Sequence, residues 1–130
     1  MSSPSELEPE IMKAVLSKAR SILEEEILPA IDAYHFPDRS FTPGDARQQV
    51  SRIKRALDQY ESATYRYQKS EAMLEIVSAT GSRSQERSLY GGGGGIKEQT
   101  NPNNPKGQEL SRAANKLRML VVNERKRLGS

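Results

Sequence analysis

The sequence predicts an all-α fold, an antiparallel three-helix bundle whose last helix follows a long flexible linker. Residues 45–79 contain neither proline nor glycine, and the Thr42-Pro43-Gly44-Asp45 motif before them is a strong helix start. Apolar residues recur every three or four positions in three segments. Only 35% of the residues are hydrophobic and 28% are charged, which is typical of helices with large solvated faces. An amphipathic helix cannot bury its apolar stripe alone, so the three segments are expected to pack together.

The first helix is predicted over about residues 8–28. Ser5 and Glu8 have the spacing of a capping box, which satisfies free backbone N–H groups at a helix start. Eight apolar residues form one stripe along this helix: Ile11, Met12, Val15, Leu16, Ala19, Ile22, Leu23 and Ile27. The stripe indicates the face that turns toward the other helices.

An acidic run near residue 28 argues that this helix does not end there. The run Glu24-Glu25-Glu26 would lie at the negative end of the helix dipole, where carboxylates are unfavourable. We therefore also expect the chain to continue past Pro29 to residue 34 as a kinked short segment. Such a segment would make a four-helix arrangement.

The second helix is predicted over about residues 43–80, with Gly81 as its stop. Its first half carries an apolar seam: Ala46, Val50, Ile53, Leu57 and Tyr60. Residues 61–71 contain no aliphatic residue larger than alanine, and a second apolar group follows: Met73, Leu74, Ile76 and Val77. At ~1.5 Å per residue the helix would span roughly 50 Å, well beyond the first helix. We expect it either to bend near residues 62–64 or to project beyond the bundle.

Residues 81–108 are predicted to be a flexible linker, because they are rich in glycine, serine, asparagine and proline. The five-glycine run at 91–95 fits a native loop and equally an engineered splice or fusion. A C-terminal helix is predicted over 109–128, with start signals at Asn104-Pro105 or Lys106-Gly107. A chain of 130 residues is normally one domain, so residues 1–80 form a helical hairpin that the last helix completes.

The composition also predicts where the protein works. Cysteine is absent, whereas small secreted domains of this polarity usually carry disulfides. No apolar run approaches the roughly 18 residues needed to span a bilayer, and the first residues do not resemble a signal peptide. An intracellular protein, cytoplasmic or nuclear, is expected.

The sequence offers no constellation for catalysis, and we expect neither an enzyme nor a cofactor. His35 is the only histidine, and it lies in a connector with phenylalanine and proline. One histidine without cysteine excludes an ordinary zinc site, and Asp32, Asp38 and Asp45 lack calcium-loop spacing. The glycine run is not followed by the Lys-Ser or Lys-Thr that a phosphate-binding loop requires.

The charge is distributed unevenly along the chain. Residues 1–44 hold eight acidic and four basic side chains, whereas residues 110–130 hold one acidic and six basic ones. The simplest interpretation is that the acidic and basic helices pack side by side. The alternative is that the basic helix binds nucleic acid through six residues: Arg112, Lys116, Arg118, Arg125, Lys126 and Arg127.

The function predicted from these features is a non-enzymatic helical protein–protein interaction or assembly module, an adaptor or scaffold subunit of coiled-coil character. The small number of apolar residues available for a core and the excess length of the second helix favour this function. Eight residues are predicted to contact a partner: Tyr60, Tyr65, Tyr67, Met73, Leu74, Val77, Met119 and Val122. The alternatives are the nucleic-acid-binding domain and a self-assembling structural subunit. We expect no small-molecule substrate.

Overall fold

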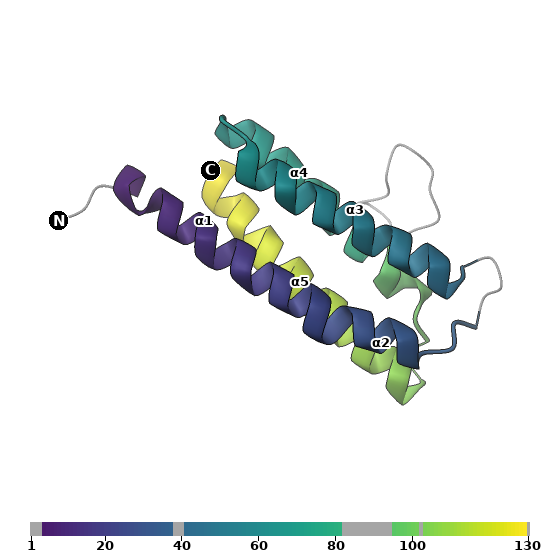
Figure 1. The fold of residues 1–130 in the computed structure, drawn as a ribbon. Helices are drawn as coiled ribbons and strands as arrows, with labels where there is room; N and C mark the ends of the chain where they lie inside the picture. Colours follow the sequence, from purple (N-terminus) through teal and green to yellow (C-terminus); the bar gives the residue numbers. More distant parts are fainter. Residues whose placement is uncertain (1–3, 38–40, 82–94, 102, 130) are drawn as a thin grey trace.

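The structure, a computed structural model, describes residues 4–37, 41–81, 95–101 and 103–129. Every regular element within these ranges is helical, which confirms the predicted all-α class. The longer helical segments lie lengthwise beside one another, and both chain ends lie toward the same end of the molecule (Figure 1). No helix of the described ranges has the length and apolarity needed to cross a bilayer.

The first helical segment is continuous from residue 4 to residue 33. It consists of α1 (Pro4–Ser21), the π-helix η1 (Ile22–Ile27) and α2 (Leu28–Ala33). A π-helical turn holds one more residue than an α-turn, and here the Leu28 N–H donates to the carbonyl of Leu23. The wider turn makes room for Pro29, whose ring would otherwise clash with the preceding turn. The helix therefore continues past the proline as expected, and α2 is its continuation rather than a separate piece.

The start of α3 (Pro43–Ser62) confirms the capping signal read from the sequence. The Thr42 N–H donates to Asp45 Oδ2 at 2.8 Å, and the Asp45 N–H donates to Thr42 Oγ1 at 3.1 Å. Each side chain thus satisfies the other residue's backbone N–H. Pro43 takes the first helical turn, where a missing N–H costs nothing.

The expected second helix over 43–80 is wrong as one element, because the chain leaves the helix between Ser62 and Arg66. Ala63 and Tyr65 have extended backbone, and α4 (Arg66–Thr80) begins after them. Gln68 Oε1 accepts from the N–H groups of Thr64 and Tyr65 at 3.2 and 3.1 Å, which caps the new helix.

Helix α4 runs back along α3 and does not project beyond it. An Arg52–Glu75 ion pair joins the middle of α3 to α4, and Lys69 Nζ reaches the carbonyl of Tyr60 near the turn. Figure 1 shows the resulting antiparallel hairpin. The physical reason is the stretch 61–71, which lacks large aliphatic residues and so could not continue the buried seam of α3.

The last helix, α5 (Pro105–Gly129), packs against both the first helical segment and α4. Lys116 pairs with Glu26 at 2.8 Å and Arg127 with Glu8 at 2.7 Å, so α5 runs antiparallel to the first segment. These pairs confirm that the acidic and basic ends of the chain lie together. The Arg66 guanidinium donates to the carbonyl of Arg127 at 3.0 Å, which places the start of α4 at the end of α5.

The connector before α3 closes one end of the core with aromatic rings. Phe36 lies edge-on to Tyr34 and to Phe41, with ring centroids 4.8 and 5.2 Å apart. The Asn101 N–H donates to the Tyr34 hydroxyl at 2.7 Å. Gly107 packs so closely on the Tyr34 ring and the Asn101 carbonyl that a Cβ there would clash.

The predicted linker contains more structure than its composition indicated. Ile96, at the start of the short 3-10 helix η3 (Ile96–Gln99), is fully buried. Helix α5 begins at Pro105, which confirms the start signal at Asn104-Pro105 and moves the end of the predicted linker back from residue 108. The Asn104 carboxamide caps α5 by accepting from the N–H groups of Lys106 and Gly107. Residues 82–94, which include most of the glycine run, lie outside the described residues. Gly81 ends α4 with φ of 96°, a conformation that favours glycine.

Candidate interaction site on α4 and α5

Three of the eight predicted contact residues are core residues. Tyr60, Met73 and Val77 are 0, 0 and 4% exposed, so they are unavailable to a partner on the folded surface. The prediction placed them on a projecting half-helix. Because α4 folds back onto α3 and also packs on α5, its apolar face is covered within the chain.

The other predicted residues reach the surface. Among the described residues, the exposed large hydrophobic side chains are Tyr65 at 59%, Tyr67 at 63%, Leu74 at 42% and Met119 at 46%. Val122 is partly buried against the core. Single exposed apolar residues are ordinary, whereas several of them on two adjacent helices make a candidate contact surface.

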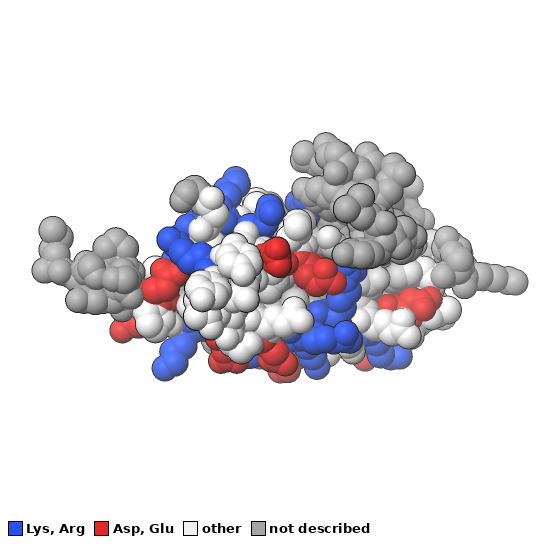
Figure 2. All heavy atoms as spheres, turned by 90° about the horizontal axis from the view of Figure 1, so that it is seen from above, with Lys and Arg blue, Asp and Glu red and all other residues white. Residues whose placement is uncertain are grey.

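Tyr65 and Tyr67 form a stacked pair at the α3–α4 connection. Their ring centroids are 5.8 Å apart and the rings are nearly parallel, with 13° between the planes. The view from above α3 and α4 shows an uncharged area toward this end of the molecule, bordered by basic and acidic side chains (Figure 2). Exposed tyrosines combine a large apolar face with a hydroxyl, which makes them frequent contact residues in interfaces.

Because α4 and α5 run antiparallel, Leu74 and Met119 lie at about the same distance from one end of the molecule. Starting from the Arg66–Arg127 hydrogen bond, Leu74 lies eight residues along α4 and Met119 eight residues back along α5. Eight residues span about 12 Å in either helix, so Leu74 and Met119 lie at the same height on neighbouring helices. Tyr67 precedes Leu74 by two turns, and Val122 follows Met119 by one turn. We call Tyr67, Leu74, Met119 and Val122 the α4–α5 apolar strip.

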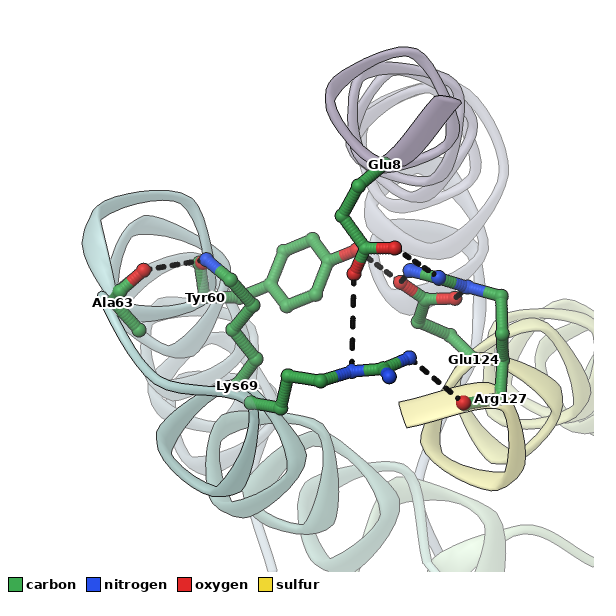
Figure 3. A network of polar contacts seen from close by, with 7 residues as sticks. Glu8, Tyr60, Ala63, Lys69, Glu124 and Arg127 are labelled. Carbon is green, nitrogen blue, oxygen red and sulfur yellow. Dashed lines mark hydrogen bonds and ion pairs between the residues drawn. The ribbon is translucent and has the colours of Figure 1, made fainter. Parts of the chain in front are cut away.

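A buried polar cluster lies at the same end of the molecule (Figure 3). The Glu124 side chain is only 2% exposed and accepts hydrogen bonds from the Tyr60 hydroxyl and from both sides of the Arg127 guanidinium, at 2.6 and 2.7 Å. The third Arg127 nitrogen donates to Glu8 at 2.7 Å. The Glu124 carboxylate thus joins α3 to α5, and the Arg127 guanidinium joins α5 to α1.

Lys69 completes this cluster from α4. Its ammonium donates to the carbonyls of Tyr60 and Ala63 at 3.2 and 2.5 Å and lies 5.7 Å from the centre of the Tyr60 ring. The two carbonyls belong to the end of α3, where backbone acceptors have no partner in the helix. Lys69 therefore satisfies the carbonyls at the end of α3 and also packs against Tyr60 of the cluster.

Burial and charge shift the pKa values of Tyr60, Glu8 and Arg127. Burial, followed by the hydrogen bond to Glu124, raises the pKa of Tyr60. The hydrogen bond from Arg127 lowers the pKa of Glu8, against the smaller opposing effect of burial. The charged groups satisfy one another, which is the arrangement of a structural cluster. The sequence did contain a signal for it, because Glu124 falls at the core spacing of the last helix, after Leu117 and Val121.

The basic residues of α5 do not form one open surface. Lys116 is paired with Glu26, and Arg127 is engaged by Glu124 and Glu8. Arg112 and Arg125 are exposed, and Arg118 and Lys126 also make contacts within the chain. A surface that binds nucleic acid needs several cations close together. Two of the six, Lys116 and Arg127, instead face the first helical segment.

The remaining polar groups of the described ranges were considered as ligands for a metal ion or a small molecule. Asp32 is paired with Arg47 at 2.5 Å, and His35 is exposed. In the described part of the chain, no three His, Asp or Glu side chains gather to hold a metal ion. An open groove of about 730 Å³ lies between α3 and α4 with polar rims, and the Arg52–Glu75 ion pair belongs to its lining.

Comparisons of the chain with protein-family models, curated proteins and solved structures find no match.

Proposed function

We propose that this protein is a non-enzymatic interaction module, an intracellular adaptor or scaffold subunit that binds another protein through helix packing. In this proposal residues 4–129 form one helical bundle, and the α4–α5 apolar strip is its contact surface. The supporting observation is that the exposed large hydrophobic residues lie on α4, on α5 and at the turn before α4.

The geometry of the strip suits a helical partner. Tyr67 and Leu74 are seven residues apart and so lie on one side of α4, while Met119 and Val122 are three apart on α5. Exposed apolar side chains on two adjacent helices can serve as anchors for an amphipathic helix of a partner. Tyr65, stacked on Tyr67, extends the surface toward the end of the molecule.

Nucleic-acid binding is the less supported alternative. Its six candidate cations include Lys116 and Arg127, whose charges are already paired inside the fold. The proposal of a self-assembling subunit shares the strip and differs only in the occupant, which sedimentation of the purified chain at several concentrations distinguishes.

Site-specific photocrosslinking tests the proposed function. A photoreactive amino acid replaces Leu74 in the full chain, which is expressed in cells of its source and irradiated. The matched control carries the same group at Lys54, which is exposed on α3 outside the strip. We expect a covalent adduct with a second polypeptide from position 74 and none from position 54. No adduct at position 74, or the same adducts at both positions, would rule out the strip as the contact surface.

A further inference from the structure

The first turns of α1 contribute little to the core. In the part of α1 whose burial is described, from residue 8 onward, Val15 is the first buried apolar residue. Before it, Ile11 and Met12 are partly buried, and residues 9, 10, 13 and 14 are exposed. The start of α1 extends beyond the ends of α4 and α5 (Figure 1). We call residues 4–14 the N-terminal strap.

The backbone of the N-terminal strap is also held weakly by its own hydrogen bonds. Pro9 lies inside α1 and has no N–H, so it cannot donate to the carbonyl of Ser5. The first N–H groups of any helix lack acceptors within that helix. Because a short helical piece is marginal without tertiary packing, the strap depends on its contacts with the rest of the molecule to remain helical.

Glu8 connects the N-terminal strap to two other helices. Its carboxylate accepts from Arg127 Nη1 of α5 at 2.7 Å and lies 4.0 Å from Arg66 Nε of α4. Figure 3 shows Glu8 reaching from α1 toward Arg127. The side chains of Glu8 and Arg127 are 26 and 27% exposed, so water and salt screen this ion pair less than they screen a pair on the open surface.

The groups beneath the N-terminal strap remain paired without it. Arg127 also donates to Glu124 at 2.6 and 2.7 Å, and the Tyr60 hydroxyl donates to the same carboxylate. Arg66 donates to the carbonyl of Arg127 at 3.0 Å. When Glu8 leaves, Arg127 Nη1 loses its acceptor at a place that the departing strap opens to water. Release of the strap therefore leaves no buried charge without a partner in this cluster.

We propose that the N-terminal strap opens by itself while the rest of the bundle stays folded, and that the Glu8–Arg127 ion pair sets how often it opens. A segment that loses few apolar contacts opens at a lower free energy than the core does. The open state exposes the guanidinium groups of Arg66 and Arg127, so the strap controls access to two cations at this end of the molecule. Binding of a partner at the α4–α5 apolar strip is not required for this motion.

Native-state hydrogen exchange of the full chain tests the inference. Exchange rates of individual amides are measured by NMR spectroscopy at pH 7 and at several urea concentrations below the unfolding transition. The variant Glu8→Gln removes the charge that pairs with Arg127. Glu10→Gln is the matched control, because Glu10 is exposed on the same strap and its loss changes the interaction with the helix dipole in a similar way.

We expect the amides of residues 10–14 to exchange at least about tenfold faster than the buried amides of α5, at rates that barely depend on urea, because a local opening exposes little surface. Glu8→Gln should accelerate exchange in the strap by at least about fivefold, and Glu10→Gln by less than about twofold.

Two results would overturn the inference. Strap amides that share the rates and the urea dependence of α5 would show that the strap opens only when the whole bundle unfolds. Equal effects of Glu8→Gln and Glu10→Gln would show that the end of α1 frays without control by the ion pair.

Discussion

At the scale of single residues, Glu124 has the largest structural consequence. It is the one acidic residue of the last 21, and α5 places it in the core with Tyr60 and Arg127 as donors. A buried carboxylate is costly unless it is fully paired, and removing it leaves its partners without an acceptor. The cluster therefore sets the relative position of α1, α3 and α5 at one end of the molecule.

Glu124→Ala should lower the free energy of unfolding by about 2–3 kcal/mol, because Arg127 and Tyr60 lose their acceptor in a site with little access to water. Arg127 keeps partial contact with solvent, which limits the loss. Urea denaturation followed by circular dichroism measures the change. Asp58→Ala is the control, since its exposed pair with Arg20 should contribute less than about 1 kcal/mol. Equal effects of the two substitutions would contradict the structural role of the cluster.

Glu8 gives the cluster a dependence on pH. Arg127 lowers the pKa of Glu8 below its ordinary value of 4.5, so ionised Glu8 stabilises the fold above about pH 4.5. That contribution disappears as the pH falls through the lowered pKa. Glu8→Gln should therefore destabilise the protein at pH 7, and its difference from the native chain should shrink on acidification. Urea unfolding midpoints of the variant and the native chain at pH 7 and at pH 3 measure this difference. A difference that grows in acid would contradict the stabilising role of ionised Glu8.

At the scale of elements, the sequence predicts features that depend on neighbouring residues better than features that depend on contacts between distant residues. The start of α3 follows from Thr42, Pro43 and Asp45, which interact within one turn, and the structure confirms it. The break at residues 63–65 was anticipated only as a bend, because no proline or glycine marks it. Lys69 adds a contact across the resulting turn, because its ammonium donates to carbonyls six and nine residues back. Periodicity within one helix contains no information about such a contact.

Lys69→Met should keep the hydrocarbon part of this side chain and remove its hydrogen bonds to Tyr60 and Ala63. We expect a loss of about 1–3 kcal/mol, since the α3 carbonyls then lack a donor in a buried place. Lys54→Met, an exposed position of α3, should change stability by less than about 0.5 kcal/mol. Thermal and urea unfolding of both variants give the comparison. Indistinguishable variants would mean that the turn does not depend on Lys69.

At the scale of the whole molecule, the apolar residues divide into two sets. One set is buried where α1, α3, α4 and α5 meet, and it includes Leu117 and Tyr60. The other set, on the outer side of α4 and α5, remains exposed. Because both sets occur at helical spacing in the sequence, only the packing of the helices separates core from contact surface.

Substitutions should separate the two sets by their effect on stability. Leu117→Ala empties a fully buried site and should cost about 2–5 kcal/mol through lost burial and a cavity. Leu74→Ser and Met119→Ser should each change stability by less than about 0.5 kcal/mol, because neither side chain fills the core. Calorimetry or urea titration provides the values. A large loss from Leu74→Ser would place Leu74 in the core and remove it from the strip.

The amino-acid sequence by itself determined the helical class, the capped start of α3, the stop at Gly81 and the pairing of acidic and basic ends. These follow from interactions within a few residues or from the overall charge pattern. Only the tertiary structure decided that α4 turns back on α3, that Ile96 is buried, and that Tyr60, Met73 and Val77 are core while Tyr67, Leu74 and Met119 are exposed. The physical reason is that burial depends on contacts between residues far apart in the chain, and helical spacing alone does not specify which face meets which neighbour.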